Sequence, residues 1–195
     1  GLTNLALSGS HFMKPLSFSN SPVLNHLSFL DLRETEFTSD SLMSLFEVIN
    51  KGTLTIDGLD LSALKFQNED DRNIFFTKIE DLSVDALKTL VFDDNQMDEK
   101  MTSSFSVFLS KLKKNLRHLV LNNSVDVSES SDGAVKLLGS LKNMNLVTLS
   151  LRSEKSSNFS FGSILTKQLN DLLLSMPTLK SIDVTGQCIS DSGLK

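Results

Sequence analysis

A short apolar pattern, Leu-x-x-Leu-x-Leu, constrains this 195-residue chain more than any other feature, because it recurs seven times. Successive copies begin 25, 29, 31, 29, 30 and 33 residues apart, and the third copy is the loosest. The copies are Leu2/Leu5/Leu7, Leu27/Leu30/Leu32, Ile56/Leu59/Leu61, Leu87/Leu90/Phe92, Leu116/Leu119/Leu121, Leu146/Leu149/Leu151 and Leu179/Ile182/Val184. In a short strand alternate residues face opposite ways, so the second and third apolar residues share one face. The regular return of one strand predicts a stack of similar units.

Between several copies lie segments with helical spacing. Their apolar faces are Leu42/Leu45/Phe46/Ile49, Phe105/Phe108/Leu109/Leu112, Val135/Leu138/Leu141 and Ile164/Leu165/Leu169/Leu172/Leu173. Polar pairs at 39–40, 98–99 and 131–132 predict helix starts, where free N–H groups need acceptors. A further apolar residue recurs five positions after the last template residue, as Phe12, Phe37, Phe66, Met97 and Ile189. In the fifth copy this position is Asp126, or its apolar neighbour Val127 takes the role. We therefore predict an α/β chain with a parallel sheet.

A repeat of about 29 residues with a strand on one side and a full helix on the other resembles the ribonuclease-inhibitor-type leucine-rich repeat. The resemblance covers essentially all 195 residues. It implies a horseshoe-shaped solenoid of about seven repeats, with the parallel sheet on the concave side and the helices on the convex side. One position departs from that family, which usually has Asn or Cys three residues after the last apolar template residue. Here that position is occupied by Ser10, Thr35, Leu64, Asn95, Ser124, Glu154 and Gln187, so only Asn95 matches fully.

The extent of the chain suggests one solenoid over residues 1–195 that is a fragment of a longer array. Gly1 leads directly into a template copy, and residues 189–194 resemble the helix start at residues 37–42. A solenoid needs polar capping repeats, and neither end of this chain looks like one. We therefore expect an eighth element, a helix, to begin at the C-terminal end.

Charge and cysteine content narrow the partner and the compartment. A formal net charge of −5 and a pI near 5.2 argue against a nucleic-acid partner, which normally meets a basic surface. The single cysteine, Cys188, excludes an internal disulfide framework. We see no apolar run long enough to span a membrane and no signal peptide, so the expected location is the cytoplasm.

Candidate catalytic and metal-binding groups do not assemble into a motif. The acids Asp93, Asp94, Asp98 and Glu99 could bind a cation, but they fit a strand exit followed by a charged helix start better. The three histidines and Cys188 are far apart in sequence, without the spacing of a zinc site or a nucleophile–base pair. No nucleotide-binding or hydrolase motif is present. We expect no enzymatic activity, no cofactor and no metal.

The template also predicts which side chains line the concave face. They are Asn4, Phe29, Asp31, Arg33, Asp57, Asp60, Lys88, Asp93, Arg117, His118, Asn122, Thr148, Arg152, Lys180 and Asp183. Acids dominate in the first four copies and bases in the last three. The predicted face is thus acidic toward the N-terminal side and basic toward the C-terminal side, although ordinary solubilising charges could segregate by chance. Such a split would orient a partner more than it would add affinity.

The expected function is that of a protein–protein interaction module or scaffold, which binds another protein through the concave face. Irregular repeats of this type also occur in actin-regulatory families, in Ran GTPase-activating proteins, in F-box adaptors and in pathogen effectors. One alternative is therefore a regulator of a small GTPase or of actin dynamics. Another is a pathogen effector that binds a host protein.

Overall fold

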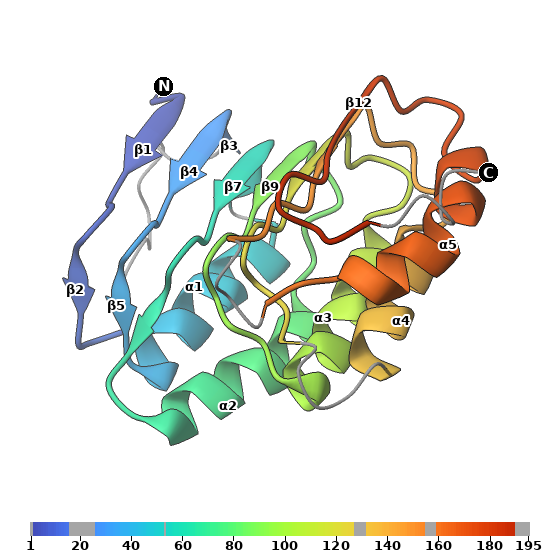
Figure 1. Ribbon diagram of the computed structural model, residues 1–195. Helices are drawn as coiled ribbons and strands as arrows, with labels where there is room; N and C mark the ends of the chain where they lie inside the picture. The colour runs from blue at the N-terminus through green and yellow to red at the C-terminus, as the bar shows by residue number, and fades with distance from the viewer. Residues whose placement is uncertain (1, 16–25, 53, 127–131, 155–158, 190–195) are drawn as a thin grey trace.

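A seven-stranded parallel sheet runs through the computed structural model, which describes residues 2–15, 26–52, 54–126, 132–154 and 159–189 (Figure 1). Its strands follow one another in space in the order of the sequence. They are β1 (Asn4–Ala6), β4 (Phe29–Asp31), β7 (Gly58–Asp60), β9 (Thr89–Val91), β10 (His118–Val120), β11 (Thr148–Ser150) and β12 (Ser181–Asp183). The expected eighth element lies outside the described residues.

The register of this sheet aligns the template copies. The central template residue of each copy pairs with that of the next, from Leu5 beside Leu30 through to Leu149 beside Ile182. One-residue slips would turn the leucines to the opposite face, so burial of the apolar row specifies the register. The prediction of an α/β chain with a parallel sheet is confirmed.

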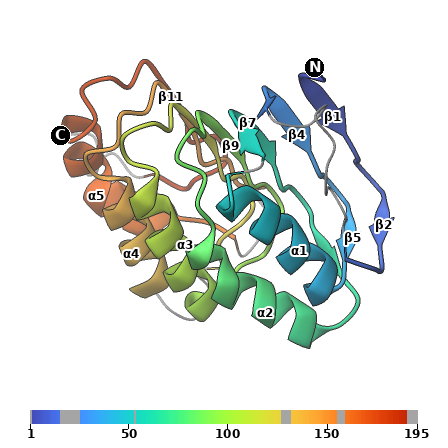
Figure 2. The same ribbon diagram turned by 180° about the vertical axis from the view of Figure 1, so that it is seen from behind.

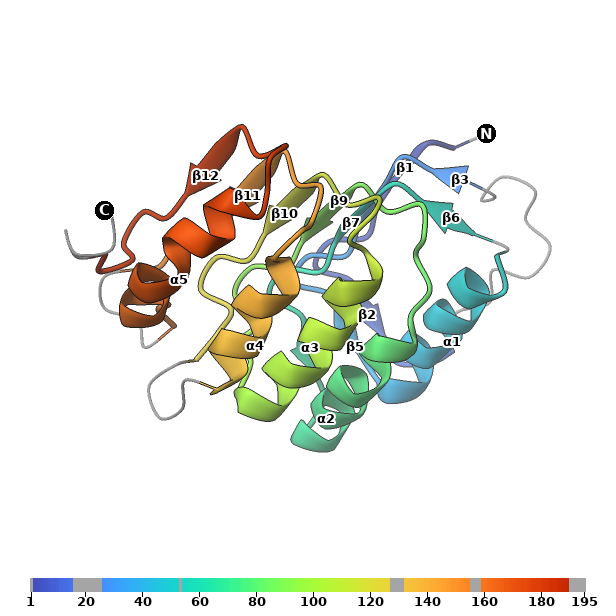
Figure 3. The same ribbon diagram turned by 90° about the vertical axis from the view of Figure 1, so that its right-hand side faces the viewer.

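The five helices of the described residues lie on one face of the sheet, and each is next to the helix that follows it (Figures 2 and 3). They are α1 (Ser39–Asn50), α2 (Glu69–Lys78), α3 (Glu99–Lys111), α4 (Asp132–Leu141) and α5 (Gly162–Leu174), with a 3₁₀ turn at Ile79–Asp81. Connections between parallel strands must cross back over the sheet, which is why helices alternate with strands. None of the helices within the described ranges has the length and apolar character needed to cross a membrane.

The helix α2 was not predicted, because its sequence lacks an apolar stripe. Its first turn is acidic, and its buried apolar residues are the adjacent Phe75 and Phe76. Two features nevertheless define it: the Asn68 side chain accepts from the N–H of Asp71, and Phe75 packs 5.5 Å from Phe66 between ring centroids. Tertiary packing of two large rings replaces a helical hydrophobic stripe here.

Two predicted helix faces were partly wrong. Val135 and Leu173 were assigned to buried faces, but both side chains are exposed. In α4 the buried row is Ala134, Leu137, Leu138 and Leu141, one residue before the predicted start. Gly133, which is also buried, permits the close packing of α4 on α3, because a Cβ there would lie 3.2 Å from the backbone of Glu99.

Two smaller parallel sheets extend the layers. The strands β2 (His11–Phe12), β5 (Glu36–Phe37) and β8 (Lys65–Phe66) form one, and β3 (His26–Leu27) and β6 (Thr55–Ile56) form the other. The first contains the apolar residues expected five positions after the template. In the fifth copy Val125 pairs with Met97, one residue before the predicted Asp126, and the alternative Val127 lies outside the described residues.

The position where the family usually has Asn or Cys performs one task in four of the copies, with several residue types. Buried side chains there donate to the carbonyl of the last template residue in the preceding copy: Thr35 to Leu7, Asn95 to Leu61, Ser124 to Phe92 and Gln187 to Leu151. Leu64 cannot donate in this way, and its backbone N–H instead donates to Asn95 Oδ1 at 3.0 Å. The departures in sequence therefore conceal a regular hydrogen-bonded row.

A left-handed backbone residue recurs at the turn beyond the strands. It lies two positions after the last template residue in six of the seven copies, at Gly9, Glu34, Ala63, Asp94, Asn123 and Gly186, with φ between 49° and 78°. Gly, Asn and Asp adopt this conformation readily, whereas Ala and Glu are strained by their Cβ atoms. The fold thus imposes one turn geometry on residues that differ in their preference for the left-handed conformation.

Candidate interaction face

One face of the seven-stranded sheet carries no described helix, and we call it the open face (Figure 3). In β9, β10 and β11 the central Leu is buried, and its neighbours on either side are only partly buried. This alternation places the leucines against the helices and their neighbours on the open face.

The residues predicted for the concave face fall into three rows on this sheet. Asn4, Phe29, Asp31, Asp60, His118, Thr148 and Asp183 lie within the strands. Arg33, Asp93, Asn122 and Arg152 lie two residues beyond a strand, along what we call the strand-end edge. Asp57, Lys88, Arg117 and Lys180 lie directly before a strand, along the strand-start edge.

An acidic pair at the strand-end edge holds one guanidinium. Arg33 Nη2 lies 2.8 Å from Asp31 Oδ2, and Arg33 Nε lies 3.3 Å from Asp60 Oδ2. The hydrogen bond from Arg33 lowers the pKa of Asp31. Burial raises the pKa of Asp60, whose Oδ1 accepts from the N–H of Ser62 at 2.9 Å. Two carboxylates around one guanidinium leave this part of the open face acidic.

A polar network joins three neighbouring strands at the same edge. Asp93 accepts from the backbone N–H of Asn122 at 2.7 Å and from its Nδ2 at 3.1 Å. Asn122 Oδ1 in turn accepts from Ser150 Oγ at 2.8 Å and from the N–H of Arg152 at 2.7 Å. Burial raises the pKa of Asp93. These bonds fix the side chains, so the edge would meet a partner in a preformed arrangement.

Ion pairs reduce the predicted charge split. Lys88 pairs with Asp57 at 3.0 Å, and Arg152 lies 3.6 Å from Asp183. Arg117 donates instead to backbone carbonyls, among them that of Asn145 at 3.3 Å. These contacts do not test whether the split is functional, and that part stays a prediction.

Two apolar open-face residues, Val91 and Val120, were missing from the predicted set, which contained Phe29. Val91 and Val120 are partly buried and flank core leucines on adjacent strands. The ring of Phe29 lies so close over Gly58 that a Cβ there would be 2.4 Å from Phe29 Cδ2. The template positions would have identified the valines, but the prediction favoured charged and polar side chains. Association gains chiefly from burying apolar surface, so these residues belong to the candidate site.

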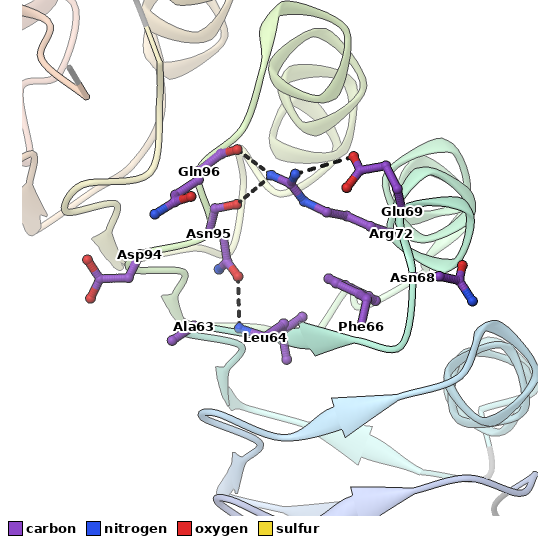
Figure 4. Close-up of a pocket in the computed structure, with 9 residues that line it drawn as sticks. All are labelled: Ala63, Leu64, Phe66, Asn68, Glu69, Arg72, Asp94, Asn95 and Gln96. Carbon is purple, nitrogen blue, oxygen red and sulfur yellow. Dashed lines mark hydrogen bonds and ion pairs between the residues drawn. The ribbon is translucent and has the colours of Figure 1, made fainter. Parts of the chain in front are cut away.

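Two hollows flank the strand-end edge. One of about 260 Å³ is lined by Arg33, Glu34, Asp60, Ser62, Ala63, Val91, Asp93 and Asp94. The other, of about 450 Å³, is lined by the residues in Figure 4. In the second hollow Arg72 donates to the carbonyls of Asn95 and Gln96 and lies 3.4 Å from Glu69. Arg72 thereby links α2 to the turn after β9, which is a structural role.

The acidic residues 93–99 divide between strand exit and helix start. Asp93 bonds Asn122, and the Asp98 side chain caps α3 by accepting from the N–H of Met101 at 2.8 Å. Within the described ranges, His, Cys, Asp and Glu form no group of three or more that could hold a metal. Cys188 is exposed.

Comparison with known proteins adds no family to this description. No family model matches the sequence, and no curated protein matches it.

Proposed function

We propose that this chain is a leucine-rich repeat solenoid of the ribonuclease-inhibitor-like type, acting as a non-enzymatic interaction module that binds another protein through the open face. The aligned template copies, the side-chain bonds to the preceding copy and the recurring left-handed turn support the repeat assignment. In such a solenoid the open face is the concave one, which is the usual binding surface of stacked repeats.

One observation carries the binding proposal: a sheet face that no described helix covers combines apolar and fixed polar groups. Val91 and Val120 form its apolar centre, and the Asp93–Asn122 network borders it. An apolar centre with a polar border is the general composition of protein interfaces. The lone cysteine, which excludes an internal disulfide framework, favours a cytoplasmic setting.

The test places charge at the centre of the open face. We expect Val91→Glu with Val120→Glu to abolish capture of the protein's partner from native lysate, because docking would bury unpaired carboxylates. The matched control is Val107→Glu with Val135→Glu, since these valines are 44% and 40% exposed on α3 and α4. Circular dichroism would establish that both variants fold. Loss of capture by the control alone, or by neither folded variant, would contradict the proposal.

A further inference from the structure

The strand-start edge carries a gradient of charge from one end of the sheet to the other. Backbone hydrogen bonds link its residues in a row: Lys88 donates to Asp57, Arg117 to Lys88, Val147 to Arg117 and Lys180 to Val147, at 2.7 to 2.9 Å. Neighbouring strands are about 4.8 Å apart, so Arg117 and Lys180 lie about 10 Å apart across two steps. Charge along this edge is therefore held at defined spacings.

Three lysines in the N-terminal half of the chain, of which Lys88 lies on this edge, are paired with carboxylates. Lys51 lies 2.5 Å from Glu47, Lys78 lies 3.5 Å from Asp81, and Lys88 lies 3.0 Å from Asp57. Basic residues at helix C-termini interact favourably with the helix dipole, which explains their presence without a ligand. Each of the three has an acidic partner close by, so these lysines add little net charge.

The second half differs, because four cations there have no carboxylate partner among the described residues. We call Lys113, Lys114, Arg117 and Lys180 the basic corner. Arg117 donates to the carbonyl of Lys114 at 2.9 Å, and the N–H of Asn145 donates to that of Lys113 at 3.3 Å, so the turn after α3 lies against the start of β10 and β11. Lys114 and Lys180 are exposed. The helix dipole does not account for Lys180, which follows the turn beyond α5.

Open-face groups next to the basic corner add hydrogen-bonding capacity. His118 Nδ1 lies 2.9 Å from Thr148 Oγ1, and Ser181 begins the next strand. Imidazole and hydroxyl groups can bond carboxylate oxygens that lie beside the cations. The polar groups at the starts of β10, β11 and β12 thus lie next to the basic corner, with Val147 between Arg117 and Lys180 in the row.

We propose that the basic corner binds an acidic segment of the partner protein, rich in Asp and Glu, as the partner lies on the open face; this proposal rests on the proposed function. Charge complementarity selects the acidic segment, and the acidic opposite end of the face around Asp31 and Asp60 repels it and sets its direction. Nucleic acid fits less well. The net charge is −5, the chain has no Trp or Tyr, and Phe29 lies three strands from the corner.

The test uses a fluorescein-labelled octaglutamate peptide and fluorescence anisotropy with the full chain. We expect binding that weakens as salt rises, and that is about tenfold weaker in Lys113→Gln/Lys114→Gln/Lys180→Gln. Arg117 is left intact because it bonds backbone carbonyls. The control Lys51→Gln/Lys78→Gln/Lys88→Gln changes the net charge equally, at lysines that pair with carboxylates, and should bind the peptide as the unsubstituted chain does.

The proposal is overturned if the peptide does not bind, or if both folded triple variants bind it equally. It is also overturned if an oligodeoxythymidine of matched charge, or phosphatidylserine vesicles, bind the corner more tightly than the peptide does. The assay needs no natural partner, so its failure is separable from that of the proposed function. If capture of the partner is lost in the Val91/Val120 variant but unchanged by the basic-corner substitutions, the open face remains the proposed binding site. Only the proposal of an acidic segment is then overturned.

Discussion

Single residues at the strand exits show how the fold uses backbone conformation. Gly9 and Gly186 occupy the same position of the first and last copies, with φ of 69° and 78°. Their surroundings differ. A Cβ on Gly9 would meet nothing within 4 Å, whereas one on Gly186 would lie 1.7 Å from the carbonyl oxygen of Ser153. The same turn is therefore open at one end of the sheet and closely packed near the other.

This difference predicts unequal effects of one substitution. Gly9→Ala should lower the free energy of unfolding by about 1 kcal/mol, the cost of a left-handed Ala. Gly186→Ala should cost about 2 to 3 kcal/mol more, because the backbone at Ser153 must move. Urea unfolding followed by circular dichroism measures both. Equal losses would show that conformational strain alone governs this position.

At the scale of elements, side-chain hydrogen bonds between successive copies link four of the strand units to the one before. Asn95 is the most complete case: its Nδ2 donates to the carbonyl of Leu61 at 2.8 Å, and its Oδ1 accepts from the N–H of Leu64 at 3.0 Å. The second bond compensates for Leu64, which cannot donate from its own side chain. The third copy lacks a polar side chain at Leu64, and the side-chain amide of Asn95 in the fourth copy compensates for it.

Asn95→Ala should therefore destabilise the chain by about 2 kcal/mol, because a buried carbonyl and a partly buried N–H lose their partner together. Asn73 is exposed on α2, and Asn73→Ala serves as the control with an expected effect near zero. Thermal or urea unfolding of both variants makes the comparison. A loss of similar size at Asn73 would point to a general effect of removing amides.

For the whole molecule, the charged groups of the open face couple stability to pH. Burial raises the pKa of Asp60 and Asp93, so the folded chain holds these protons to higher pH than the unfolded chain does. Each ionised carboxylate then reduces the free energy of unfolding as pH rises through its folded-state pKa. Asp31 acts in the opposite direction, because Arg33 lowers its pKa.

Asp60→Asn should remove the pH-dependent loss of stability that ionisation of Asp60 causes, while keeping an acceptor for the N–H of Ser62. As pH rises from about 4 to about 7, we expect the free energy of unfolding of the variant to increase relative to that of the unsubstituted chain. Only the unsubstituted chain must ionise a carboxyl group at position 60 over this range. Urea unfolding at both pH values gives the two differences. A relative stability that is constant or falls over this range would contradict a raised pKa at Asp60.

The sequence by itself determined the seven strands, their register and most of the helices. Buried leucines at a strand period leave one solution for the register, since a slip would expose the whole row. Local signals were also enough for the start of α3, where Asp98 is followed by Glu99 and a helical apolar stripe. These features depend on residues close together in the chain.

Only the tertiary structure decided what depends on neighbours from other copies. Packing of Phe75 against Phe66 stabilises α2. Thr35 and Gln187 make hydrogen bonds to the preceding copy, although only Asn95 matches the residue usual in the family at this position. It also paired the charges, which neutralises Lys88 and leaves Lys180 free of carboxylates among the described residues. The physical reason is that side-chain hydrogen bonds and ion pairs depend on distances across strands, and one-dimensional spacing does not contain them.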